Sequence, residues 1–417
     1  MKVKLKGPSV RKTVSLFEED FDLEEKYQLT TTLNGNNSKL QLFDTDILLG
    51  NSSVKGELLA EKSAKRWLVT TKLTSDNIDI NDILPTVVDD EHEKATSKEG
   101  KLLSDKPFNT SWLTYVDIDF DVNFNNITNG EILLGDYIVI ANLMDGVLRT
   151  KVTVSGGYQD KKSNYDFELK AIDKALDLIL LVDIKNFDLG TLLALTDLTD
   201  GVEGELDVDV EFQGRGKSVS QMISQGSGIL RVDGGEGRIS STLLNLWGTG
   251  LTSSLLFTAA PNKNVDTKFN CGAAKFVLEN GFFESQGIVL DTPETTMAGQ
   301  IQIKLPEETL KGVVKPEPKK TSIVSIRTPV TVSGTVLEPK ITVASDDALL
   351  TPFNMVVDFY ATPFVLVKNV LSSDAENPCE EALSETGRAE KKGVIEVITS
   401  PIKAFFGVFK SKEPATQ

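Results

Sequence analysis

Apolar and acidic residues alternate with a period of two along several segments of this chain, and this pattern leaves few folds open. In a β-strand successive side chains point to opposite faces, so each segment has one oily face and one acidic face. Antiparallel sheets with one solvated face give this pattern, whereas buried parallel strands are apolar throughout. The clearest segments carry Val116, Ile118, Phe120, Val122 and Phe124, and then Leu206, Val208, Val210 and Phe212.

Short turn signals separate these segments. Asn-Gly and Asp-Gly pairs favour hairpin turns, and they occur at Asn34-Gly35, Asp145-Gly146 and Asn280-Gly281. One course of turn, strand and glycine break begins at Leu33 and again at Met144, which indicates stacked repeats that share an apolar surface. We therefore expect a mainly β protein: an elongated, curled antiparallel sheet built from repeated meanders, with a few helices toward the C-terminus.

The pattern divides the chain into six segments. Two β repeat modules flank a charged loop, and a third β region carries an inserted helix with apolar residues at spacings of three and four. An apolar helix and a basic amphipathic tail follow. The predicted bounds are 1–86 for the first module, 87–110 for the loop, 111–200 for the second module, 201–345 for the β region with its helix at 240–257, 346–385 for the apolar helix and 386–417 for the tail.

Composition excludes several classes of function. Lysine and arginine number 44 against 61 aspartates and glutamates, a net charge of −17, so nucleic acid is not an expected partner. The one histidine, His92, lies in the charged loop, which argues against histidine-based catalysis and histidine-rich metal sites. We expect no enzyme activity, no cofactor and no metal.

The acidic residues Asp117, Asp119 and Asp121 are the most tempting site. On one strand face they lie about 7 Å apart, too far for one ion to bind all three without help from other strands. Catalytic carboxylate pairs also need unlike environments, and these three are alike. A solvated outer face is the favoured interpretation. Arg215-Gly216-Lys217-Ser218 resembles the end of a phosphate-binding loop, but Glu211 stands where that motif requires glycine.

The two cysteines leave two interpretations open. Cys271 and Cys379 could form a disulfide if the chain meets an oxidising compartment, which requires their Cα atoms to lie within about 7 Å. Otherwise we expect a buried Cys271 and an exposed Cys379.

Membrane contact is also left open by the sequence. The start of the chain lacks the apolar region of a signal peptide, and no run of 18 or more apolar residues marks a span. The tail could lie on a membrane surface through its apolar residues, with lysines toward anionic headgroups, or it could dock on the protein's own open edge or apolar groove. The membrane-surface candidates are Lys403, Phe405, Phe406 and Phe409.

Over about residues 20 to 385 the order and spacing of short motifs resemble the AsmA family. They include Glu211-Phe212-Gln213-Gly214-Arg215-Gly216-Lys217-Ser218, Leu290-Asp291-Thr292, Leu305-Pro306-Glu307-Glu308-Thr309-Leu310, Thr328-Pro329-Val330, Glu338-Pro339-Lys340-Ile341 and Asn377-Pro378-Cys379.

This resemblance implies a Gram-negative envelope protein, with a β-rich body in the periplasm and an N-terminal inner-membrane helix. The family is implicated in outer-membrane biogenesis, in protein targeting to membranes, and in moving phospholipid along a hydrophobic groove; it offers no catalytic residues. The membrane helix is absent from this sequence, so we expect either a truncated or split member or a different anchor.

The residues support the groove independently, because few helices are available to cover so much sheet. The sheet must curl on itself or keep an apolar trough that accepts acyl chains; plain core packing is the alternative for each residue. The groove candidates are Val116, Ile118, Phe120, Val122, Phe124, Leu206, Val208 and Val210. Expected partners are phospholipid or another acyl-chain lipid and the membrane surface. The alternative function is a structural factor for outer-membrane protein targeting and assembly, whose partners are assembly components.

Overall fold

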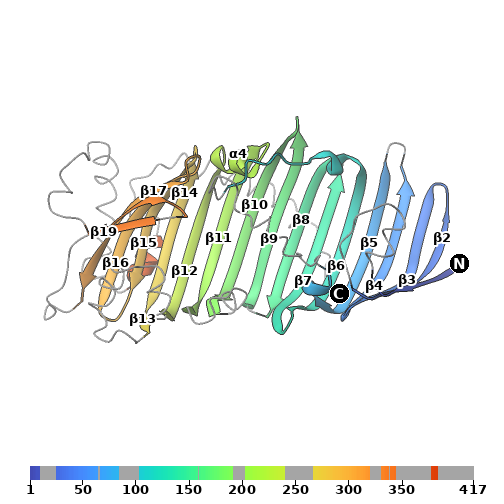
Figure 1. Ribbon diagram of the computed structural model, residues 1–417, viewed down its shortest axis with the longest axis horizontal. Coiled ribbons are helices and arrows are strands. Elements are labelled where there is room, and N and C mark those ends of the chain that lie inside the picture. The colour runs from blue at the N-terminus through green and yellow to red at the C-terminus, as the bar shows by residue number, and fades with distance from the viewer. Residues whose placement is uncertain are drawn as a thin grey trace, which may run out of the picture. The chain divides into compact units, whose positions relative to one another are not determined.

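The computed structural model describes residues 1–9, 25–63, 66–83, 103–157, 159–190, 202–239, 266–319, 330–337, 339–343 and 377–383. These residues form 19 strands and a few short helices (Figure 1), so the mainly-β class is confirmed. The predicted helix at 240–257, most of the apolar helix at 346–385 and the tail at 386–417 lie outside the described residues, as do Lys403, Phe405, Phe406 and Phe409. None of the described helices is long and apolar enough to cross a membrane.

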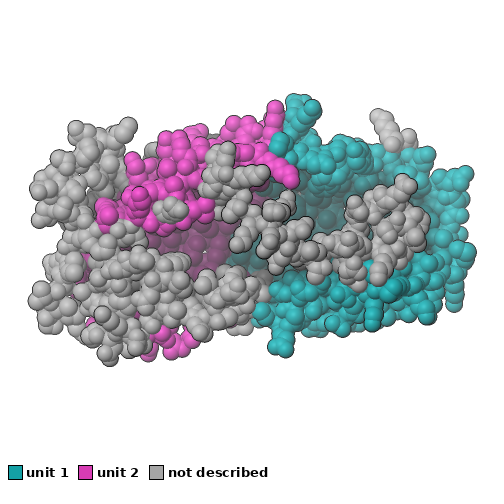
Figure 2. Space-filling model, viewed as in Figure 1, with its two compact units in different colours: residues 1–99, 107–178, 182–186 teal, residues 100–106, 179–181, 187–417 magenta. Residues whose placement is uncertain are grey.

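The chain divides into two units, which are coloured separately in Figure 2. Unit 1 comprises residues 1–99, 107–178 and 182–186, and unit 2 comprises residues 100–106, 179–181 and 187–417. In Figure 2 unit 1, taken by itself, is hollowed between two rims on the side turned to the viewer.

Unit 1 is built from antiparallel meanders, as predicted. The turn predicted at Asn34-Gly35 is wrong, because both residues pair within the ladder and the chain turns at residues 37–38. Strands β1 to β5 pair in sequence, and so do β6 to β9, all antiparallel. Most residues of β10 also belong to this unit. The strands are β1 (Lys2–Gly7), β2 (Tyr27–Asn36), β3 (Lys39–Leu49), β4 (Ser52–Lys62), β5 (Trp67–Asp79), β6 (Val116–Asn129), β7 (Ile132–Met144), β8 (Val147–Gly156), β9 (Gln159–Ile172) and β10 (Ala175–Asp188).

The junction between the two meanders is parallel. Strand β5 pairs with β6 in parallel register, with Trp67 opposite Val116 and Val69 opposite Ile118. Parallel neighbours need a crossover connection of a dozen or more residues, and residues 80–115 connect these two strands. The helix α2 (Ile80–Ile83) begins this connection, and the 3-10 turn η2 (Ser111–Thr114) ends it.

Asp82 ties α2 back to the first meander. Its side chain is buried, and its Oδ2 accepts hydrogen bonds from the backbone of Asn51 and from the Ser52 hydroxyl, both at 2.8 Å. Gly50, in the same turn, has φ +56°, and an added Cβ there would lie 2.2 Å from Asp82. The glycine break that marks the repeat is thus required by close packing at the end of the meander.

Unit 2, taken by itself, is an antiparallel ladder. Strand β11 pairs with β12, β12 with both β13 and β14, and β14 to β19 pair in sequence. The elements are β11 (Val202–Gly216), α4 (Val219–Ser224), β12 (Ser227–Ile239), β13 (Thr267–Phe269), β14 (Cys271–Glu279), β15 (Phe282–Asp291), β16 (Thr295–Lys304), β17 (Thr309–Pro318), β18 (Val330–Thr335), β19 (Pro339–Val343) and α9 (Pro378–Leu383).

A buried carboxylate fixes the turn between β15 and β16. Asp291 accepts hydrogen bonds from Asn270 Nδ2 at 2.7 Å, Thr296 Oγ1 at 2.5 Å and Lys319 Nζ at 2.8 Å. Burial alone would raise the pKa of Asp291, but the hydrogen bonds from Lys319, Thr296 and Asn270 outweigh it and lower the pKa. The ionised carboxylate therefore stabilises this end of unit 2.

Candidate functional site

The register of unit 1 gathers apolar side chains on one face, because directly paired residues on neighbouring strands project to the same side. Ile118 lies opposite Val69 and Leu143, and Val122, four residues further along the same strand, lies opposite Leu73 and Val139 in the same way. Two rows run across β5 to β9: Val69, Ile118, Leu143, Leu148 and Leu169, and then Leu73, Val122, Val139, Val152 and Tyr165. We call this surface the apolar face of unit 1.

Burial on the apolar face of unit 1 is uneven. Val122 is 1% exposed and Leu143 is fully buried, which is typical of a core. Val116, Ile118, Phe120 and Phe124 are only half-buried, although they belong to the same face of β6. The structure thus places all five predicted residues of this segment on one face, and four of them keep part of their apolar surface accessible.

The opposite face of unit 1 is polar. One row across it reads Lys72, Asp121, Ile140, Lys151 and Asp166. Asp119 and Asp121 are exposed, which confirms the solvated outer face predicted for them. Asp117 differs, because it is half-buried and lies 3.4 Å from the Arg66 guanidinium, which also pairs with Asp145.

The polar face holds no arrangement suited to metal binding among the residues that the structure describes. Asp166 lies opposite Lys151, and burial raises its pKa, while the charge of Lys151 opposes part of that rise. The carboxylates along these strands are spread over the face and do not converge.

Two isoleucines stand out on the polar face. Ile138 is 43% exposed and Ile140 is 51% exposed, between the polar neighbours Asn123 and Thr153 and the charged neighbours Asp121 and Lys151. The alternation pattern did not single them out as exposed, because Ile138, Val139 and Ile140 are apolar at consecutive positions. Such a run signals a strand with apolar residues on both faces.

Unit 2 has an apolar face of its own. Val208 lies opposite Val232, which lies opposite Ala274, and Val210 lies opposite Leu230, which lies opposite Phe276. Phe276 stacks on Phe283 with ring centroids 4.6 Å apart. The predicted residues Leu206, Val208 and Val210 share this face and are half-buried. We call this surface the apolar face of unit 2.

One end of β11 is covered by α4. Ser218 caps this helix by accepting a hydrogen bond from the Gln221 backbone, as serine commonly does at a helix start. Gly216 allows close approach, because an added Cβ would lie 2.3 Å from the backbone nitrogen of Met222. The segment Arg215-Gly216-Lys217-Ser218, which resembles the end of a phosphate-binding loop in sequence, therefore serves helix packing at the end of a strand.

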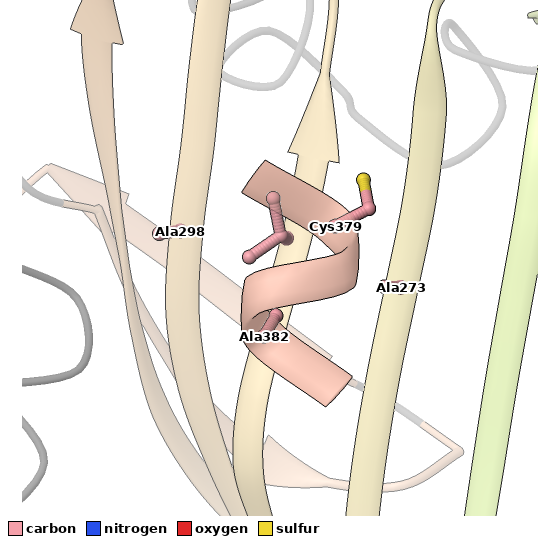
Figure 3. Close-up of a cluster of buried hydrophobic side chains, with 5 residues drawn as sticks. Ala273, Ala298, Cys379 and Ala382 are labelled. Carbon is pink, nitrogen blue, oxygen red and sulfur yellow. The ribbon is translucent and has the colours of Figure 1, made fainter. Parts of the chain in front are cut away.

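The helix α9 packs against β14 and β15 of unit 2. Cys379 forms a disulfide with Cys271 across 108 residues, with Cα atoms 6.2 Å apart. Cys379 is 2% exposed, so the alternative of an exposed Cys379 is wrong. Figure 3 shows Cys379 and Ala382 of α9 over Ala273 and Ala298 of the strands, and Val289 completes this buried cluster.

The register decides which face α9 covers. Ala273 lies opposite Asp233, which lies opposite Asp207, so the cluster belongs to the polar face of unit 2. The apolar face with Leu206, Val208 and Val210 is left uncovered by α9. The sequence alone does not predict which face α9 covers, because that depends on the position in the sheet to which Cys379 is bonded.

Comparison with known proteins gives a consistent result. The AsmA family model matches residues 18–288, which is more than half of the chain. The AsmA family protein YhjG of Escherichia coli (strain K12) is 24% identical over 252 residues, which cover 60% of this chain and 36% of that protein. The chain thus spans about a third of the length of this relative. No solved structure matches the chain.

Proposed function

The chain belongs to the AsmA family, and on this premise we propose that it is a non-enzymatic protein that binds or bridges phospholipid, or another acyl-chain lipid, in outer-membrane biogenesis. Family membership itself suggests an envelope-related function. The proposed binding surfaces are the apolar faces of the two units, each considered by itself.

The observation that carries this proposal is the incomplete burial of aligned apolar residues. Ile118, Phe120 and Phe124 follow each other along one face of β6, yet none is sealed as Val122 is. Each Å² of apolar surface removed from water contributes about 25 cal/mol. An acyl chain laid along this face would remove the remaining surface from water without needing a specific polar contact.

The disulfide supports a periplasmic location. Disulfides persist in oxidising compartments such as the bacterial periplasm and are rare in the cytosol. The bond between Cys271 and Cys379 is built into the packing of α9, since Cys379 is buried in the same cluster as Ala382. Localisation of the full chain by cell fractionation, with the redox state of its thiols measured in each fraction, tests this part of the proposal.

A matched pair of isoleucines tests lipid binding. Ile118 belongs to the apolar face of β6, and Ile140 belongs to the polar face of the adjacent strand β7. The variants Ile118→Asn and Ile140→Asn make the same chemical change on opposite faces. Lipid extracted from each purified variant is quantified by mass spectrometry. We expect reduced lipid content for Ile118→Asn alone; equal content in both variants would argue against the proposal.

A second candidate is an assembly factor for outer-membrane proteins that does not carry lipid. The exposed Ile138 and Ile140 favour it, because apolar side chains on an otherwise polar face are typical of protein contact surfaces. A photocrosslinker at position 140 should then capture an outer-membrane assembly component in cells. Lipid-free purified protein together with such capture would replace the lipid-binding proposal by this one.

A further inference from the structure

Three exposed aromatic residues lie at one rim of the apolar face of unit 1, where β5 and β6 begin. Trp67 is 36% exposed, Trp112 is 41% exposed and Tyr115 is 71% exposed. Trp67 lies opposite Val116, and Tyr115 directly precedes Val116 in the chain. The backbone thus brings all three to the same end of the same strand pair.

The turn that presents two of these residues is firmly built. Leu113 in η2 is fully buried, and the Thr114 hydroxyl donates to the Ser111 carbonyl oxygen at 2.8 Å. Asn109 Oδ1 accepts hydrogen bonds from the backbone and the hydroxyl of Ser111. Trp112 and Tyr115 are therefore exposed on a turn that is itself anchored. Exposing their aromatic rings to water is unfavourable, and the packing of the turn does not explain it.

A cation completes the rim. Lys62 pairs directly with Trp67 across β4 and β5, so both side chains project from the apolar face. Lys62 is exposed, and within the part of the chain that the structure describes it forms no ion pair. By contrast, the neighbouring Arg66 is engaged with Asp117 and Asp145.

These groups match the polar end of a lipid. An ammonium group binds phosphate through charge-assisted hydrogen bonds. Tryptophan and tyrosine combine an apolar ring with a polar atom, and they favour the level of the glycerol and headgroups where lipid meets water. Beyond the rim, the rows through Val69 and Ile118 offer an apolar path for the acyl chains.

We propose that Lys62, Trp67, Trp112 and Tyr115 form a seat for the phosphate and glycerol of a glycerophospholipid whose acyl chains lie on the apolar face of unit 1. This inference rests on the proposed function and adds to it the class of lipid, the position of its phosphate and the rim at which it is held. Diacylglycerol, which has the same acyl chains and no phosphate, is the matched lipid that lacks the feature recognised by Lys62.

The first test compares Lys62→Gln with Lys72→Gln in the full chain. Lys72 is also exposed and lies on β5, but it projects from the polar face. Retention of phosphatidylglycerol and of diacylglycerol is measured for each. We expect Lys62→Gln to weaken phosphatidylglycerol retention about twofold to fivefold, as for an exposed charge pair, and to leave diacylglycerol retention unchanged. Lys72→Gln should change neither.

The outcomes separate the two proposals. Equal effects of Lys62→Gln on both lipids, or no effect on either, would overturn the seat while leaving lipid binding intact. Failure of the unaltered protein to retain either lipid would overturn the proposed function and the seat together. Displacement of phosphatidylglycerol by an equal concentration of glycerophosphate would show a free-phosphate site and overturn the lipid seat.

Tryptophan fluorescence gives an independent readout. The chain has three tryptophans, and the third is Trp247. Trp112→Phe/Trp247→Phe leaves Trp67 as the only indole, and Trp67→Phe/Trp247→Phe leaves Trp112. Each variant is loaded with phospholipid whose acyl chain carries bromine, which quenches indole fluorescence, near either its carboxyl end or its methyl end. We expect a larger loss of fluorescence from the carboxyl-end label at both positions. Equal or reversed losses would overturn the seat.

Discussion

The disulfide between Cys271 and Cys379 joins residues that are 108 positions apart, so replacing both cysteines by serine opens a long covalent loop. For a loop of about 100 residues, the lost restriction of the unfolded chain corresponds to about 4.7 kcal/mol at 25 °C. The helix α9 has six residues, and isolated helices of this length are unstable in water. Its departure would also expose Ala273, Val289 and Ala298.

We therefore expect Cys271→Ser/Cys379→Ser to lower the unfolding free energy of the strands under α9 by about 3 to 5 kcal/mol. Because the chain has two units, the assay should be local: hydrogen exchange of β14 to β16 as a function of urea, with β6 to β8 in unit 1 as the internal control. Lipid content should not change, because α9 covers the polar face of unit 2. Unchanged exchange of β14 to β16, or loss of lipid together with α9, would refute this reasoning.

Three further predictions concern single residues. Gly216→Ala should destabilise unit 2 by about 1 to 3 kcal/mol, because its Cβ would meet Met222, whereas Gly235→Ala, with nothing within 4 Å, should cost little; urea unfolding measures both. Val122→Ala should cost about 1.5 to 3 kcal/mol in lipid-free protein and Val116→Ala less, because Val122 is sealed and Val116 is half-buried; similar losses would contradict the uneven burial. The pKa of Asp291 is lower in the folded protein than its ordinary value of 3.8, so its stabilisation is complete above that value and disappears as the pH falls through the folded pKa. The destabilisation of Asp291→Asn should therefore shrink in acid.

Much of the fold follows from local pattern. The alternation at Val116 to Phe124 and at Leu206 to Phe212 predicted β6 and β11. Asp145-Gly146 and Asn280-Gly281 form the turns between β7 and β8 and between β14 and β15 as predicted, whereas the turn predicted at Asn34-Gly35 is two to three residues too early. These features are local because side-chain alternation and turn geometry depend on residues a few positions apart. The same alternation placed the predicted groove residues of β6 on one face, where the register confirms that they lie together.

What the pattern could not give depends on long-range pairing. Nothing in the alternation specifies that β5 and β6 pair in parallel, because a parallel and an antiparallel neighbour present the same faces. Trp67 and Tyr115 are 48 positions apart in the chain, and only the β5–β6 register brings them to one rim. The pairing of Cys271 with Cys379, and hence the face that α9 covers, likewise required the structure.

Site-resolved photocrosslinking to lipid along β6 tests most directly whether the apolar faces hold acyl chains. A crosslinker is placed at position 118 on the apolar face or at position 119, which faces the opposite side of the same strand. We predict that position 118 captures phospholipid in cells and that position 119 does not. Equal capture at both positions, or none at position 118 in protein that folds normally, would contradict it.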